Sequence, residues 1–122
     1  MGDLTVFKHL QNLTMIEISN PKEYQKFIKS CPVVLVHFWA KWNGYDAQIK
    51  NTLKGIESSY LGKACFGTVD VDIEEMVSIC QELKLGNVPT LAYYKGGRHI
   101  ETIIETIVGL NQRVEEKLTF LI

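Results

Sequence analysis

The sequence lacks the features that would tie it to a membrane or to nucleic acid. No apolar run approaches the roughly 20 residues of a membrane-spanning helix, and the start, Met1 to Val6, lacks the basic region and long apolar segment of a signal peptide. Excess charge is also missing, because 13 basic residues nearly cancel 14 acidic ones. A neutral chain has no overall field that attracts nucleic acid or an anionic membrane. We therefore expect neither partner, and a cytoplasmic protein, with the nucleus as the alternative.

Cysteine is scarce, with three residues, Cys31, Cys65 and Cys80, at wide and irregular spacing. This pattern is neither a disulfide framework nor a zinc motif, and it fits a reducing compartment. We expect no metal and no cofactor. Cysteines of this kind are most often buried for structural reasons, but a redox role for any of the three stays open.

The chain is long enough for one domain, since 122 residues with 46% hydrophobic content supply a single substantial core. We place this domain at residues 14–122, after an N-terminal extension at 1–13 that holds a short helix around Leu4 to Gln11. No internal repeat interrupts it.

Hydrophobic periodicity alternates between strands and helices along the domain. Asn20 and Pro21 have the residue types of an N-cap and a first helical position. The nearly all-apolar run from Val33 to Phe38 predicts a central strand covered on both faces. The pattern predicts an α/β fold with strands near 14–18, 33–38, 65–71, 88–94 and 100–107, and helices near 21–31, 44–60, 73–85 and 111–122.

Several ordered segments carry a family resemblance from about Met15 onward: 36–42, 69–72, Val88-Pro89-Thr90, Lys95-Gly96-Gly97 and Val108-Gly109. Through them the sequence resembles the thioredoxin family. The resemblance implies a thioredoxin-like three-layer sandwich with a mixed five-stranded central sheet flanked by helices. It also implies a cis peptide bond at Val88-Pro89 that faces the turn at Asn43.

The sequence departs from this family at its motif positions, Asn43, Gly44, Tyr45 and Asp46. The resemblance implies cysteines where Asn43 and Asp46 stand, a proline at Tyr45 and a buried aspartate at His37. Neither an amide nor a carboxylate attacks a disulfide through sulfur, so we expect no catalytic residue in this turn. His37-Phe38-Trp39-Ala40 is also similar to the thioredoxin-like domain that precedes monothiol glutaredoxin domains.

Asn43 and Asp46 have the spacing of a capping box at the start of the helix that follows. We predict that they stabilise this helix, with a hydrogen bond from Asp46 to a partner as the alternative. His37 is interpreted as a buried polar residue of the core, since no carboxylate stands nearby in sequence.

The aromatic residues of the turn suggest a partner-binding surface. With the fold implied by the resemblance, Trp42 and Tyr45 lie beside Val88, Pro89 and Thr90 and form an apolar groove, where the backbone of Val88 is free to pair with an extended peptide. We predict a redox-inactive adaptor that binds a protein or extended peptide in this groove.

Two alternatives remain open. One is a thiol–disulfide oxidoreductase or redox sensor that uses a cysteine outside the motif. Cys31 and Cys65 lie at the starts of strands expected to be neighbours, which permits a regulatory disulfide between them. The other is a structural subunit whose groove has no ligand. We rank both below the adaptor, and whether the chain is an enzyme is left undecided.

Overall fold

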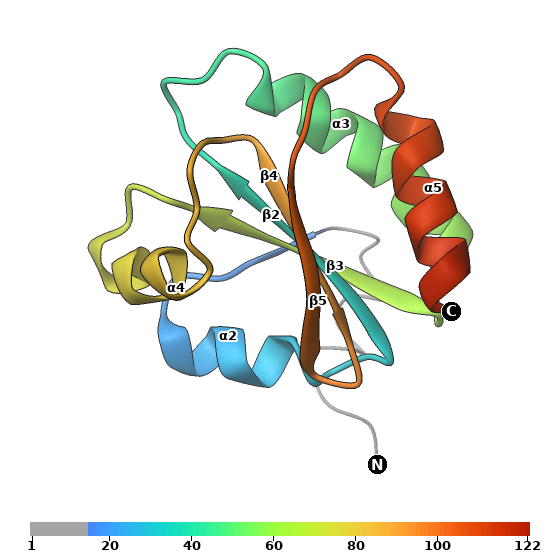
Figure 1. Ribbon diagram of the computed structural model, residues 1–122, viewed down its shortest axis with the longest axis horizontal. Coiled ribbons are helices and arrows are strands. Elements are labelled where there is room, and N and C mark those ends of the chain that lie inside the picture. Colours follow the sequence, from blue (N-terminus) through green and yellow to red (C-terminus); the bar gives the residue numbers. More distant parts are fainter. Residues whose placement is uncertain (1–14) are drawn as a thin grey trace.

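A five-stranded mixed sheet with the strand order β1-β3-β2-β4-β5 forms the centre of the molecule (Figure 1). The computed structural model describes residues 15–122. The strands are β1 (Ile16–Glu17), β2 (Val33–Trp39), β3 (Ala64–Asp70), β4 (Thr90–Lys95) and β5 (Arg98–Ile104). The helix predicted at Leu4 to Gln11 and the predicted boundary between residues 13 and 14 lie outside the described residues.

Among residues 15–122, four α-helices flank the sheet: α2 (Pro21–Phe27), α3 (Asp46–Glu57), α4 (Val77–Glu82) and α5 (Leu110–Leu121). Two short 3₁₀ segments, η1 (Ser58–Tyr60) and η2 (Glu74–Met76), adjoin α3 and α4. Helices α2 and α4 cover one face of the sheet, and α3 and α5 cover the other (Figure 1). The predicted α/β fold and its three layers are therefore confirmed.

The central strand β2 pairs with a parallel neighbour on one side and an antiparallel neighbour on the other. Strand β2 pairs in parallel with β3, with Val33 opposite Ala64, and in antiparallel fashion with β4, with Val33 opposite Lys95. Strands β4 and β5 form a hairpin through Gly96 and Gly97, whose φ angles of 58° and 80° suit glycine. Alternate residues of β2 thus enter two separate cores, one on each face of the sheet.

Helix boundaries differ from the prediction in a few places. Helix α2 begins at Pro21 as predicted, and the Asn20 side chain accepts a hydrogen bond from the Glu23 amide at 2.9 Å. Helix α3 begins at Asp46, two residues later than predicted. The helix predicted over 73–85 is divided into η2 and α4.

Within residues 15–122, none of the helices combines the length and the apolar character that crossing a membrane requires. The cytoplasmic location stays a prediction.

Candidate functional site

The turn after β2 is fastened to the loop of the cis peptide bond by Asn43. Its Nδ2 donates a hydrogen bond to the Val88 carbonyl at 2.8 Å, and its Oδ1 accepts one from the Tyr45 amide at 2.9 Å. The Val88–Pro89 peptide bond is cis. Asn43 is not the N-cap of α3, because that position belongs to Tyr45, which makes no side-chain capping bond. The side chain of Asn43 therefore joins two loops that are 45 residues apart in sequence.

Asp46 points into the core and does not cap the helix. It is 4% exposed, its Oδ1 lies 3.1 Å from His37 Nε2, and its Oδ2 accepts a hydrogen bond from the Ala40 amide at 3.0 Å. The predicted capping box is therefore wrong for both residues. The interpretation that no nearby carboxylate serves His37 is also wrong, because the chain turns back between β2 and α3 and brings Asp46 beneath the strand.

A signal for the His37–Asp46 pair was present in the sequence. A polar residue within a fully apolar strand needs a partner, and Asp46 is the sole acidic residue within ten positions of His37. The pair also leaves His37 Nδ1 without a hydrogen-bond partner in the described part of the chain. The site thus contains a buried carboxylate and a buried imidazole but no thiol.

The predicted groove is only partly assembled. Trp42 and Tyr45 are 67% and 65% exposed, whereas Val88, Pro89 and Thr90 are buried. The Val88 amide donates to Asn87 Oδ1 at 2.8 Å, and its carbonyl accepts from Asn43. The expectation that the Val88 backbone is free to pair with a peptide is therefore wrong, since both of its groups are bonded within the chain.

A pocket of about 420 Å³ adjoins this loop. Trp42 and Val88 line it, together with residues at the end of β3 and along α4, but Tyr45, Pro89 and Thr90 do not. The structure thus brings together two of the five residues that the sequence assigned to partner binding, and the binding role of the set stays a prediction.

Cys80 lies in the wall of the same pocket as a free, partly buried thiol. Burial raises the pKa of its thiol above the ordinary value, and the resulting shortage of thiolate makes the sulfur a weaker nucleophile at neutral pH. Cys80 is therefore poorly suited to attack a disulfide.

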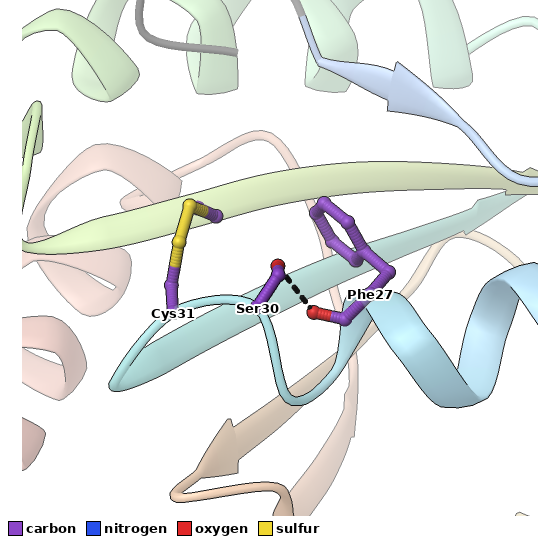
Figure 2. Close-up of a disulfide and its surroundings, with 4 residues drawn as sticks. Phe27, Ser30 and Cys31 are labelled. Carbon is purple, nitrogen blue, oxygen red and sulfur yellow. Dashed lines mark hydrogen bonds between the residues drawn. A yellow bond between two sulfur atoms is a disulfide. The ribbon is translucent and has the colours of Figure 1, made fainter. Parts of the chain in front are cut away.

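Cys31 and Cys65 form a disulfide, with Cα atoms 6.0 Å apart and a sequence separation of 34 (Figure 2). Cys31 lies in the turn between α2 and β2, and Cys65 is the second residue of β3. Because β2 and β3 run parallel with Val33 opposite Ala64, the segments that lead into the two strands lie side by side. The disulfide between Cys31 and Cys65 that the sequence left open is thus formed.

Local bonds direct Cys31 toward β3. The amide and the hydroxyl of Ser30 both donate to the Phe27 carbonyl, at 3.0 and 2.6 Å, and turn the chain at the end of α2. Figure 2 shows Ser30 bonded to Phe27 and the Cys31 sulfur reaching the strand above it. Cys31 is 8% exposed and Cys65 2%, so Cys31 is the more exposed residue of the pair. The disulfide lies at the start of β2, and the motif turn lies at the end of the same strand.

No metal centre is found among residues 15–122, where no three histidine, cysteine or acidic side chains are grouped so that they could hold an ion.

Comparison with known proteins finds relatives that are named thioredoxins. A protein-family model described as Thioredoxin matches residues 15–117. A thioredoxin from Coprinus comatus is 31% identical over 102 residues, which span 83% of this chain and 91% of that protein. Thioredoxin 1 of a Nostoc species is 28% identical over 96 residues, 77% of this chain and 88% of that protein.

Solved structures agree in fold. Malassezia sympodialis thioredoxin superposes with a TM-score of 0.73 at 26% identity, covering 88% of this chain and 90% of that one. The oxidised thioredoxin of Plasmodium falciparum gives a TM-score of 0.75 at 24% identity, and the match covers 86% of this chain and 99% of that one.

These findings overturn the prediction of a redox-inactive adaptor. The relatives are named thioredoxins, and this chain contains a disulfide outside the altered motif. The absence of sulfur at positions 43 and 46 removes redox chemistry from that turn alone. It does not remove redox chemistry from the molecule.

Proposed function

The chain belongs to the thioredoxin family, and on this premise we propose that it is a thiol–disulfide oxidoreductase that acts through Cys31 and Cys65. The observation that carries the proposal is the disulfide itself, which the fold assembles from two residues 34 positions apart. The partner is a protein or extended peptide that carries a thiol or a disulfide.

The proposed reaction is a two-electron exchange. A partner thiolate attacks Cys31 Sγ, the Cys31–Cys65 bond breaks, and Cys65 leaves as a thiolate that takes up a proton. A second thiolate of the partner then attacks the partner sulfur of the mixed disulfide and releases Cys31. The partner dithiol becomes a disulfide, and the chain gains two thiols. Reversal of the same steps reduces a partner disulfide.

Exposure determines which sulfur is attacked. Cys31 lies in a turn that leads into β2, whereas Cys65 lies within β3 and is paired there with Val34 of β2. The greater exposure of Cys31 supports its role as the attacked atom, with Cys65 as the leaving group. Access to a bulky partner requires local opening of the turn around Ser30.

A redox sensor is the second candidate, and the near-complete burial of Cys65 favours it. A sensor reacts once and then holds its new state, while an oxidoreductase turns over. Reduction would free the turn after α2 from β3, which gives the sensor a structural response.

Insulin reduction by dithiothreitol tests the proposal. We expect turnover above background in the wild type and its loss in Cys31→Ser and in Cys65→Ser, while Cys80→Ser and Asn43→Ala keep it. Circular dichroism establishes that the serine variants are folded. Turnover that survives both Cys31→Ser and Cys65→Ser contradicts the proposal.

Alkylation and mass spectrometry in glutathione buffers separate the two candidates. A Cys31–Cys65 pair that interconverts with its reduced form but gives no insulin turnover supports the sensor. A pair that stays oxidised in the folded protein under every buffer contradicts both.

A further inference from the structure

Basic side chains gather around the disulfide. Three chain segments meet at this end of the sheet, at residues 26–33, 61–65 and 94–98, and none contains an acidic residue. They hold five of the 13 basic residues of a chain whose net charge is −1: Lys26, Lys29, Lys63, Lys95 and Arg98. The last four are called the basic rim below.

The fold brings the rim together from distant parts of the sequence. Val33 lies opposite both Ala64 and Lys95, and Lys95 lies opposite Arg98. The Gly96 amide donates to the Pro32 carbonyl at 2.9 Å, which attaches the β4–β5 turn to the residue that follows Cys31. The rim and the disulfide therefore lie at the same end of the sheet, where β2 and β3 begin.

The side chain of Lys29 lies against the same turn. A Cβ atom placed on Gly97 would lie 2.9 Å from Lys29 Cγ. Lys29 is two residues before Cys31, and Lys63 is two residues before Cys65, so each sulfur has a basic residue close by in sequence.

The rim is exposed, and its members form no ion pair with one another or with any other residue of 15–122. All four side chains are exposed, and within the described residues the ion pairs join His37 to Asp46, Arg113 to Glu105 and Lys117 to Glu101. The basic residues of α5 are thus paired with Glu101 and Glu105, while those of the rim have no acidic partner among the described residues.

The opposite end of β3 has the opposite sign. Asp70, Asp72, Glu74 and Glu75 follow one another closely there. The near-zero net charge of the chain therefore conceals a separation of charge along the sheet, with the positive end at the disulfide. A local field of this kind attracts oppositely charged partners and accelerates their encounter.

We propose that the basic rim selects an acidic partner: the thiol or disulfide that reacts at Cys31 is carried by a peptide segment with carboxylates beside its cysteine. This inference rests on the proposed exchange at Cys31–Cys65 and names the class of its substrate. The attacking thiolate is itself an anion, and acidic neighbours add to the attraction. The effect is electrostatic, so salt weakens it.

Small thiols of equal size and different charge test the local field. The rate of reduction of Cys31–Cys65 is measured with 2-mercaptoethanesulfonate, 2-mercaptoethanol and 2-aminoethanethiol. Each rate is divided by that of the same thiol with a small reference disulfide, which removes differences in intrinsic nucleophilicity. We expect the sulfonate to give the highest normalised rate, the alcohol an intermediate rate and the amine the lowest. The ratio of the highest to the lowest rate, called the span below, should be about tenfold at low ionic strength and should fall as salt is added.

Charge variants locate the effect. Lys29→Gln and Lys63→Gln each reduce the span, and the double variant reduces it further. Lys54→Gln, an exposed lysine on α3 outside the rim, leaves the span unchanged.

Two cysteine peptides test the partner itself, one with aspartates and one with lysines beside the cysteine, each referenced to the small disulfide. We expect the aspartate peptide to exchange faster. Equal rates for the two peptides, or a span that persists in high salt or in the Lys29→Gln, Lys63→Gln variant, overturn the acidic partner and leave the exchange reaction in place. Absence of exchange with all thiols contradicts the proposed function, and the partner class falls with it.

Discussion

At the scale of the residue, Asp46 joins two parts of the chain through its two carboxylate oxygens. One oxygen meets His37 in the central strand, and the other accepts the Ala40 amide in the turn. A capping residue would contact solvent-exposed amides at the end of a helix, but these two contacts are buried. Buried polar contacts lose more free energy than exposed ones when one partner is removed.

Replacement of Asp46 by alanine therefore tests its role. Asp46→Ala leaves His37 Nε2 and the Ala40 amide buried without a partner, and we expect the free energy of unfolding to fall by about 3 kcal/mol. Urea denaturation measures it. A capping role would give about 1 kcal/mol, so a loss that small contradicts the buried role. Asp72→Ala, at an exposed acid, should change stability by less than about 0.5 kcal/mol.

Buried tyrosines are a second residue-scale feature. Tyr24 and Tyr94 share a hydrogen bond of 2.6 Å between their hydroxyls, and Tyr93 is fully buried on the other face of the sheet. Burial raises the pKa of all three hydroxyls above the ordinary value, most of all for Tyr24 and Tyr93. These groups stay protonated in the folded chain at pH values where an unfolded chain ionises them.

Alkaline pH should therefore lower the stability. Below about pH 10, tyrosines are protonated in both states, and their raised pKa values contribute fully to stability. Above it the unfolded chain binds fewer protons than the folded chain, so the free energy of unfolding falls as pH rises. Urea midpoints between about pH 8.5 and 11 measure the slope. Tyr24→Phe should flatten it and Tyr45→Phe, at an exposed residue, should not; equal slopes in both variants would disprove the assignment.

At the scale of the element, Gly67 of β3 determines how closely α2 packs on the sheet. A Cβ atom at this position would lie 2.6 Å from Phe27 Cε2 and 2.9 Å from Ile18 Cδ1. The ring of Phe27 occupies that space, and the turn that follows Phe27 leads to Cys31. The absence of a side chain at Gly67 thus allows close packing of the helix that precedes the turn with Cys31.

Two glycine-to-alanine substitutions should have opposite effects. Gly67→Ala forces Phe27 and Ile18 to move, and we expect a loss of about 1–3 kcal/mol. Gly55→Ala, on α3 with nothing within 4 Å of its Cβ position, should gain up to about 1 kcal/mol through helix propensity. Thermal and urea unfolding measure both. A neutral Gly67→Ala variant would show that the contact relaxes freely.

At the scale of the whole molecule, the Cys31–Cys65 bond joins residues 34 positions apart and closes a loop that contains β2, the motif turn and α3. Such a crosslink limits the unfolded chain, and a loop of this length corresponds to roughly 4 kcal/mol in the chain-entropy model. The redox state of one pair therefore affects the stability of the entire domain.

Reduction should make the protein less stable by about 2–4 kcal/mol. Urea unfolding with and without a reductant measures this loss of stability. The Cys80→Ser variant should lose as much stability on reduction as the wild type. The Cys31→Ser, Cys65→Ser double variant should be equally stable in both conditions. A wild type whose stability is the same in both conditions would mean that the crosslink does not constrain the unfolded chain.

The fold class, the order of the elements and the N-cap at Asn20 follow from the sequence alone, because periodicity and capping depend on residues close together along the chain. The sequence also determined that the motif turn has no sulfur. The prediction of a redox-inactive adaptor was wrong, because the loss of sulfur from the motif turn does not exclude redox chemistry at other cysteines.

Only the tertiary structure decided which distant groups meet. The parallel register of β2 and β3 brought Cys31 to Cys65, and the return of the chain at α3 brought Asp46 to His37. The approach of two loops brought the side-chain amide of Asn43 to the Val88 carbonyl. Each of these pairings depends on which segments are neighbours in space. Hydrophobic patterning sets which face of an element is buried, but it leaves open which side chain lies opposite on the next element.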